Sequence, residues 1–324
     1  MLLAVAFKKS LFLLTLFISL LPLATASETK SEPIKPLVAD LTIDPKLVAL
    51  GDQLFHDPRL SKDNSVSCAS CHQLSQGGTD DKPRSSGVDG AMGEIKTPTV
   101  FNCSYNLAQF WDGRAVTLEE QAAGPIHNPV EMNSSWSEVR AKLSRDPSMV
   151  AAFNELFDDG ISSDNIATAI ATFERSLVTI NSRFDRWLQG ENSLTEQELQ
   201  GYRLFQNYGC ISCHQGANVG GNMYAYMGAM GDYFESRNSK LTRADLGRFN
   251  VTGQEEDRHY FKVPSLRLAA INPPYFHDGS ATTLEEAVRI MGLYQLGREI
   301  PEAHIQDIIA FLRTLIGEHS KLTP

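Results

Sequence analysis

The stretch Cys68-Ala69-Ser70-Cys71-His72 decides the fold, and a second copy follows as Cys210-Ile211-Ser212-Cys213-His214. Two cysteines separated by two residues and followed directly by a histidine can bind a haem through two thioether bonds, with the histidine as an iron ligand. A zinc site or a disulfide is the alternative, but zinc sites of this spacing do not require that histidine. The two copies therefore predict two covalent c-type haems, attached through Cys68, Cys71, Cys210 and Cys213 and ligated by His72 and His214.

The amino terminus has the pattern of an export signal. Lys8 and Lys9 precede an apolar run over residues 11–23, and Ala24-Thr25-Ala26 offers a small-residue cleavage site. This pattern predicts a cleaved Sec-type signal peptide over residues 1–26, with an uncleaved anchor as the alternative. A leader over 27–43 follows, of which residues 27–36 are expected to be mobile. No later stretch is long enough to span a bilayer. We therefore expect the mature protein in the periplasm, because c-type haems are attached outside the bacterial cytoplasm.

The composition is acidic. The formal net charge of −10 becomes −12 once the two lysines of the signal are removed. This balance argues against a nucleic-acid partner and suits a basic redox partner such as a small cytochrome. The fifth cysteine, Cys103, lies outside both motifs, and we expect it to be a small buried hydrophobe rather than a reactive thiol.

An internal repeat covers most of the chain. Phe110-Trp111-Asp112-Gly113 matches Phe276-His277-Asp278-Gly279, and Thr117-Leu118-Glu119-Glu120 matches Thr283-Leu284-Glu285-Glu286, both at an offset of 166 residues. The haem cysteines are offset by only 142 residues (210 − 68), so the second copy carries 166 − 142 = 24 extra residues after its motif. The chain therefore reads as two copies of one cytochrome unit.

Apolar residues recur at helical spacing before each haem motif and near the end of each copy, over 47–55, 166–177, 194–205 and 305–316. We therefore predict a mainly α fold with two class I cytochrome c-like domains, each with one haem. The expected bounds are 44–188 for the first domain and 189–320 for the second. The Gly-, Ser-, Asp- and Pro-rich stretch between His72 and Pro98 is expected to be a loop over a haem.

The repeat distinguishes the two irons. A class I cytochrome c takes its second iron ligand from a methionine downstream of the haem motif, and Met291 is well placed for that role. The same offset places Pro125 at the matching position of the first copy, and proline cannot ligate iron. We therefore expect Met291 to close the second iron and the first iron to keep an open position for a small molecule. The competing ligands are Met132, Met223, Met227, Met230 and, at the first iron, His127.

Two side chains near Pro125 suit peroxide chemistry. Cleavage of the O–O bond requires a proton to move from one oxygen to the other, which a nearby carboxylate can carry. Glu131 is the candidate acid/base, and Gln121 is the candidate that positions peroxide; the alternative is that both are solvated surface residues. Trp111 has an apolar ring with an N–H donor and is the candidate electron relay between the haems, with a plain core tryptophan as the alternative.

These residues resemble the bacterial dihaem cytochrome c peroxidases over nearly the full mature length. The matching stretches include residues 57–61, 97–102, 109–114, 118–121, 130–132 and 274–277, together with Met291-Gly292. The resemblance implies a peroxidatic haem in the first domain and an electron-accepting haem in the second. It also implies reduction of hydrogen peroxide to water with electrons from a small cytochrome c or a cupredoxin, and a homodimer as in related proteins. Gln121, Glu131, Trp111 and Met291 match the positions of that family's functional residues.

The chain departs from the family in two places. Many members have a histidine in the loop after Gly87 that caps the first iron until the other haem is reduced, whereas this chain has Val88-Asp89-Gly90. We therefore expect the first haem to be open without reduction, or to be capped by another group. Relatives also bind calcium through an asparagine where this chain has Lys96. Calcium stays open as a cofactor, but an ammonium cannot ligate a cation.

Two other functions compete with a peroxidase. One is a maturation enzyme similar to MauG, the dihaem protein that oxidises tryptophans on a partner; that group has a tyrosine ligand where this chain has Met291. The other is a dihaem electron carrier without catalysis, against which the presence of Gln121 and Glu131 argues.

Overall fold

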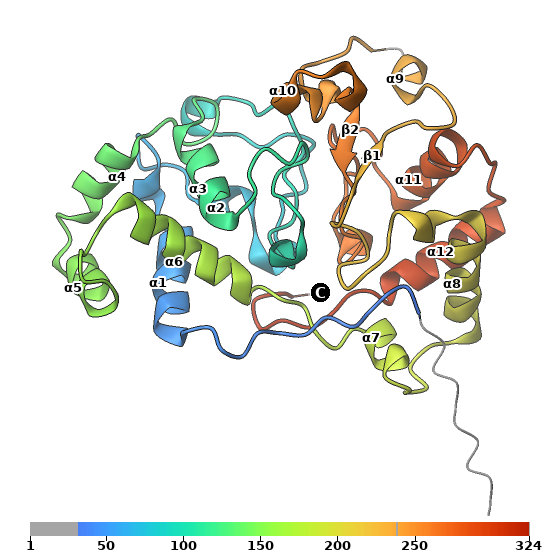
Figure 1. Cartoon of the computed structure of the whole chain (residues 1–324), viewed down its shortest axis with the longest axis horizontal. Helices are drawn as coiled ribbons and strands as arrows, with labels where there is room; N and C mark the ends of the chain where they lie inside the picture. Colours follow the sequence, from blue (N-terminus) through green and yellow to red (C-terminus); the bar gives the residue numbers. More distant parts are fainter. Residues whose placement is uncertain (1–31, 238, 324) are drawn as a thin grey trace, which may run out of the picture. The chain divides into compact units, whose positions relative to one another are not determined.

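The computed structural model describes residues 32–237 and 239–323 (Figure 1). These residues are mainly helical, which confirms the predicted mainly α character. The helices are α1 (Pro45–Phe55), α2 (Cys68–Cys71), α3 (Leu118–His127), α4 (Trp136–Leu143), α5 (Pro147–Leu156), α6 (Ser163–Ser176), α7 (Arg183–Leu188), α8 (Glu196–Tyr208), α9 (Tyr233–Ser236), α10 (Phe249–Thr252), α11 (Leu284–Ile290) and α12 (Glu302–Arg313). Strands β1 (Tyr224–Tyr226) and β2 (Tyr260–Lys262) pair antiparallel, with Ala225 opposite Phe261.

The predicted signal peptide and the first residues of the leader lie outside the described ranges. Within those ranges, no helix combines the length and the apolar character that a membrane crossing needs.

Helix α1 packs on α6 to form the core of the N-terminal half. It begins at Pro45 because the Asp44 side chain accepts a hydrogen bond from the Lys46 amide at 2.9 Å, and proline at the first helical position has no amide to satisfy. Gly51 permits the close approach of the two helices, since a Cβ there would lie 2.0 Å from the Ala169 carbonyl oxygen. Helix α3 packs on the same helix α6, which places the Pro125 region beside this core.

Helix α8 packs on α12 in the same manner in the C-terminal half. Thr195 and Glu198 form a capping box at its start. Its last turn ends at Gly209, whose φ of 97° is a left-handed conformation that glycine adopts without a steric penalty. The turn places Cys210 directly after the helix, so this helix end positions the second haem motif.

The predicted repeat is visible in the backbone. Thr117 caps α3 through the Glu120 amide, and Thr283 caps α11 through the Glu286 amide. The turn before each cap is closed by an isolated bridge, Gln109 with Ala115 and Tyr275 with Ala281, both pairs related by 166 residues. The offset read from the sequence therefore relates the same local structure in both halves.

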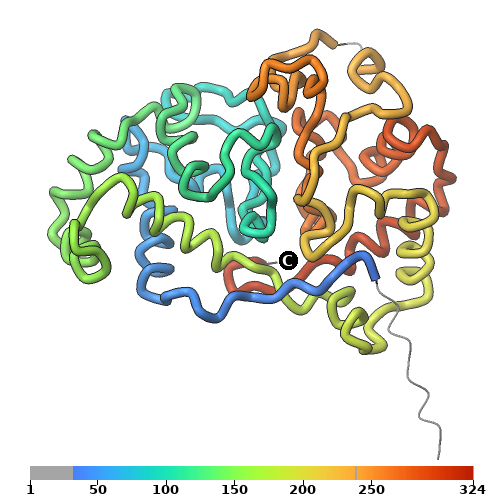
Figure 2. The backbone as a smooth tube through the Cα atoms, in the orientation of Figure 1, coloured from blue at the N-terminus to red at the C-terminus, as the bar shows by residue number. Residues whose placement is uncertain are grey.

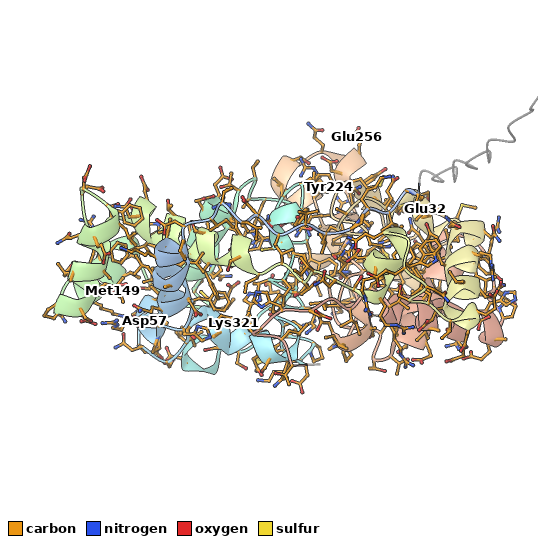
Figure 3. All side chains as sticks on the ribbon, turned by 90° about the horizontal axis from the view of Figure 1, so that it is seen from below. Glu32, Asp57, Met149, Tyr224, Glu256 and Lys321 are labelled. Carbon is orange, nitrogen blue, oxygen red and sulfur yellow. The ribbon has the colours of Figure 1, made fainter. Side chains whose placement is uncertain are left out.

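Both ends of the described chain cross between the halves. In Figure 2 the blue segment after residue 32 starts beside the C-terminal half and leads to α1; Ile34 is fully buried there and bridges Gly216. This part of the leader is therefore packed rather than free. At the other end Lys321 donates a hydrogen bond to Asp52 of α1 at 2.7 Å, and Figure 3 shows Lys321 beside the N-terminal half, far from Glu32.

Candidate functional site

The first haem motif lines a cavity of about 630 Å³. Cys68, Cys71 and His72 reach this cavity from α2, whose start is fixed by a capping box between Ser67 and Ser70. The loop that was expected to cover a haem contributes Ser85, Ser86, Gly87, Gly93, Glu94 and Ile95 to the lining. Cys103 also reaches this lining and is buried with Leu118 and Ala171, which confirms its prediction as a small buried hydrophobe.

The candidate catalytic side chains converge on this first cavity. Gln121 and Pro125 reach it from α3, and Glu131 and Trp111 reach it from flanking loops. The Met132 amide donates to the Pro125 carbonyl oxygen at 3.1 Å, which folds the loop carrying Glu131 back onto α3. The four residues that the sequence places near the first iron or between the two irons thus lie around one cavity.

Glu131 is the ionisable side chain among these four, and its surroundings shift its pKa. Its Oε1 accepts a hydrogen bond from Asn128 Nδ2 at 2.7 Å. Burial raises the pKa of the Glu131 carboxyl, and the Asn128 hydrogen bond and the Arg114 charge only partly oppose this. Its own carbonyl oxygen accepts from the Val88 amide at 2.8 Å. The carboxyl is thus held in place and favours its protonated form more than a solvated glutamate does.

Residues 88–90, directly after Gly87, pack against the Glu131 loop and do not line the cavity. Gly87 is required there, since a Cβ would lie 2.2 Å from the Val130 carbonyl oxygen. Val88 is buried in the core of the N-terminal half, and Asp89 is exposed. Neither Val88 nor Asp89 lines the cavity.

The second haem motif lines a cavity of about 280 Å³. Cys210, Cys213 and His214 share this cavity with Met291, which caps α11. Of the competing methionines, Met227 also lines it, whereas Met132 lines the first cavity, and Met223 and Met230 line neither. Burial lowers the pKa of His214 to about 4, which keeps its imidazole neutral and able to act as a ligand.

The donor sets fit haem attachment better than the alternatives. All four motif cysteines are free thiols, so they form no disulfide. None belongs to the cluster of His, Cys, Asp or Glu side chains in the described ranges that is compact enough for a metal ion. His72 Nδ1 lies 3.1 Å from the Gly78 carbonyl oxygen, and as a donor to that oxygen it leaves Nε2 free for iron. His127 packs edge-on against Trp136 and does not line the first cavity.

One wall separates the two cavities. Trp111 and Phe261 line both of them, as do Thr97, Pro98 and Thr99. The Trp111 indole N–H donates to the Lys96 carbonyl oxygen at 2.9 Å, and the Trp111 carbonyl oxygen accepts from the Lys262 amide at 2.8 Å. The indole is therefore held by a bond within the N-terminal half, and the Trp111 backbone is joined to the C-terminal half.

Lys96 is buried beside this wall. Its ammonium donates to Thr79 Oγ1 at 2.9 Å and also bonds the Asp80 carbonyl oxygen. Burial lowers the pKa of Lys96, and the Asp80 charge opposes that shift. A cationic group of the chain itself thus occupies this cluster of oxygen atoms.

Part of the first cavity could not be recognised from the sequence. Arg243, Ala244, Gly247, Asn250 and Val251 line it although they belong to the second copy, and Glu174 of α6 lines it from the core side. The 24 extra residues after the second motif were the available signal for the first group. Glu174 carried no signal, because an acidic residue in an amphipathic helix usually faces solvent.

The chain is mainly helical and has two cavities, which share an aromatic wall. Each cavity is lined by paired cysteines and a histidine, as expected for a di-haem redox protein. A family model described as "Di-haem cytochrome c peroxidase" matches residues 45–193. Cytochrome c peroxidase Ccp of Escherichia coli is 48% identical over 298 residues, which is 91% of this chain and 63% of that protein. Cytochrome c551 peroxidase of Nitrosomonas europaea is 47% identical over 313 residues, which is 94% of this chain and 92% of that protein.

Among solved structures, a MauG-like protein associated with microbial copper homeostasis superimposes with a TM-score of 0.75 at 29% identity, covering 88% of this chain and 93% of that one. The chain belongs to the di-haem cytochrome c peroxidase family. It spans less than two thirds of the Escherichia coli relative and nearly all of the Nitrosomonas relative.

Proposed function

We propose that this chain is a periplasmic cytochrome c peroxidase that reduces hydrogen peroxide to water. The observation that carries the proposal is that Gln121 and Glu131 line the same cavity as His72, while Trp111 lines that cavity and the second one. The partners would be hydrogen peroxide, a small cytochrome c or cupredoxin as electron donor, and a second copy of the chain in a homodimer. The named peroxidases at 47–48% identity support this function.

Each of the two domains would hold one haem with its own role. Residues 44–188 would hold one covalent haem through Cys68, Cys71 and His72, and residues 189–320 the other through Cys210, Cys213 and His214. Bound haems would supply an iron at which peroxide binds and a second iron that receives electrons. Met291 would be the further ligand in the second cavity, where Met227 is the competing thioether. Export through the signal at residues 1–26 would place the protein in the periplasm.

Glu131 would move the proton that O–O cleavage requires. The Asn128 hydrogen bond to Oε1 leaves Oε2 free to take a proton from one peroxide oxygen and to deliver it to the other. Gln121 on α3 would hold the peroxide by its side-chain amide. The apolar part of the lining, which includes Pro125, would keep bulk water away from this transfer.

Trp111 would carry electrons from the second cavity to the first. Its indole is held by the Lys96 carbonyl oxygen, so the ring keeps one orientation between the cavities. A carbonyl oxygen accepts a hydrogen bond but is too weak a base to remove the indole proton. The N–H would therefore be retained when the ring loses an electron.

The first cavity would be open to peroxide before any reduction. Pro125 has no ligand atom, Val88 is buried in the core and Asp89 is exposed, so none of these side chains would cap the iron. Calcium would be dispensable, because the Lys96 ammonium already bonds Thr79 and Asp80.

Peroxide consumption by the holoprotein with a reduced small cytochrome tests this function. A peroxidase oxidises two equivalents of cytochrome for each peroxide consumed. An electron carrier exchanges electrons with the cytochrome and consumes no peroxide. A MauG-like maturation enzyme, which the missing loop histidine favours, consumes peroxide only together with oxidation of a partner protein.

A further inference from the structure

The aromatic wall between the cavities contains a third ring besides Trp111 and Phe261. His277 stands 166 residues after Trp111 and lines the second cavity. Its ring stacks on Phe261 at a centroid distance of 4.5 Å and meets Trp111 edge-on at 6.4 Å. The repeat therefore places His277 against Trp111 from the other half of the chain.

Asp245 holds the His277 ring in this place. His277 Nε2 lies 2.8 Å from Asp245 Oδ1, and both residues are almost fully buried. The other carboxylate oxygen accepts from the Thr242 amide at 2.7 Å and from its hydroxyl at 2.9 Å. Asp245 and Thr242 both lie in the loop between His214 and Pro264, which is 24 residues longer than the loop between His72 and Pro98. The extra length of the second copy thus supplies the support for His277.

The group around Asp245 carries one net negative charge when His277 is neutral. Arg237 pairs with Asp245 at 2.8 Å and also with Asp278, so one guanidinium faces two carboxylates. Burial alone would raise the pKa of Asp245, but the hydrogen bonds from His277 and Thr242 and the Arg237 charge lower it below its ordinary value. Asp245 therefore stays ionised beside the wall.

A metal site is the competing interpretation of this group. Asp245, His277 and Asp278 offer ligand atoms within 4.8 Å of one another. Arg237 already pairs with both carboxylates, and its positive charge repels a cation. The group is therefore a closed ion network rather than a vacant metal site.

We propose that Asp245 is a positioning residue for electron transfer between the two cavities. It orients the His277 ring against Trp111. Trp111 carries a positive charge after it passes one electron to the first cavity and before it recovers one from the second, and the negative charge of Asp245 stabilises that state. Peroxide is the final oxidant, and the indole keeps its proton on the Lys96 carbonyl oxygen. This inference rests on the proposed relay role of Trp111.

The test measures electron transfer in half-reduced holoprotein mixed with one equivalent of hydrogen peroxide, followed by the absorbance of the second haem. Asp245→Asn removes the charge and keeps one of the two acceptor oxygens, for His277 or for Thr242, and we expect transfer to become roughly tenfold slower. The midpoint potentials of both haems should stay unchanged, and the electron paramagnetic resonance signal of a tryptophan radical should decrease. Asp245→Glu, which restores the charge, should recover most of the rate.

Two further variants separate charge from packing. Asp185→Asn removes a carboxylate that is equally buried and paired with Arg267 at 2.7 Å, but that contacts neither Trp111 nor His277, so transfer should keep its wild-type rate. Arg237→Gln removes the cation of the network, and transfer should be no slower than in the wild type. Slowing by Asp185→Asn or Arg237→Gln to the extent of Asp245→Asn would overturn the inference, because general disruption would then explain all three.

Trp111→Phe separates a failure of this inference from a failure of the proposed relay. Slow transfer in Trp111→Phe with a wild-type rate in Asp245→Asn would overturn the role of Asp245 and leave the relay standing. A wild-type rate in Trp111→Phe would overturn both. A further outcome is that the midpoint potential of a haem changes in Asp245→Asn by enough to explain the slower transfer. That result would assign the effect to the haem and would also overturn the inference.

Discussion

The two halves share one backbone plan but present different side chains at four repeat-related positions. Trp111, Gln121, Pro125 and Glu131 line the first cavity, and the residues 166 positions later are His277, Ala287, Met291 and Gly297. In the second half the acid and the amide are absent, and a thioether stands where the first half has a proline. A few side-chain differences on a repeated backbone thus give the first cavity a carboxylate and an amide and the second cavity a thioether.

Helices α6 and α12 extend the comparison to the core side of each cavity. Ile170 and Glu174 of α6 line the first cavity, and Ile308 and Leu312 of α12 line the second, both pairs at an offset of 138 residues. A buried acid therefore stands in the first half where the second has a leucine. Polar side chains thus line the first cavity both from α6 and from the α3 side.

Loss of the Glu131 carboxylate should have the largest effect. Glu131→Gln keeps the side-chain shape but cannot transfer a proton, so peroxide turnover should fall by at least roughly a hundredfold. Steady-state oxidation of a reduced cytochrome measures this. Glu155→Gln, at an exposed glutamate paired with Lys46, is the matched control and should keep wild-type turnover. Turnover near the wild-type rate in Glu131→Gln would remove Glu131 from the mechanism.

Pro125→Met should convert the first cavity toward the second. The substitution places a thioether at the position that corresponds to Met291 and also removes a proline from within α3. We expect the absorbance spectrum of the first ferric haem to change from high spin to low spin, and cyanide to bind roughly tenfold more weakly. Pro125→Ala, which adds no ligand, should retain the wild-type spectrum. A high-spin first haem in Pro125→Met would mean that this position does not face the iron.

Met291→His should lower the midpoint potential of the second haem, by on the order of 100 mV, because imidazole favours ferric iron more than a thioether does. Spectroelectrochemical titration measures the shift. Met227→Leu, at the other methionine of this cavity, should leave the potential unchanged. The reverse pattern would assign the ligand to Met227.

Glu174→Gln should have the smallest effect on turnover and should change the stability of the protein instead. Burial raises the pKa of Glu174 to about 8 from an ordinary value of 4.5, and its Oε2 has no hydrogen-bond partner among the described residues. The folded protein therefore holds this proton more tightly than the unfolded chain. The contribution is full below pH 4.5 and is lost as the pH rises through 8.

Denaturant unfolding of the wild type and Glu174→Gln at pH 5 and pH 9 would measure this loss. The variant should be more stable than the wild type at pH 9, by on the order of 5 kcal/mol at about 1.4 kcal/mol per pKa unit, and close to it at pH 5. An equal difference at both pH values would mean that Glu174 does not titrate between them.

Much of this arrangement follows from local sequence rules. The two haem motifs, the 166-residue offset and the placement of Gln121, Pro125 and Glu131 in one cavity were predictable, because repeated caps and turns fix repeated backbone geometry. The helical class followed from apolar spacing in segments such as 166–177.

Contacts between distant segments could not be predicted in this way. Nothing local indicates that Ile34 would be buried beside Gly216, or that Arg243 from the second copy would line the first cavity. The pairing of His277 with Asp245 depends on how the longer second loop folds over the wall. Such contacts are set by tertiary packing, which local sequence patterns do not indicate.

The absorbance and electron paramagnetic resonance spectra of the all-ferric holoprotein, recorded before and after one equivalent of hydrogen peroxide, test the difference between the halves most directly. We expect one high-spin haem in the first cavity, one low-spin haem in the second, and consumption of peroxide without prior reduction. Two low-spin haems and no reaction with peroxide until one haem is reduced would contradict it.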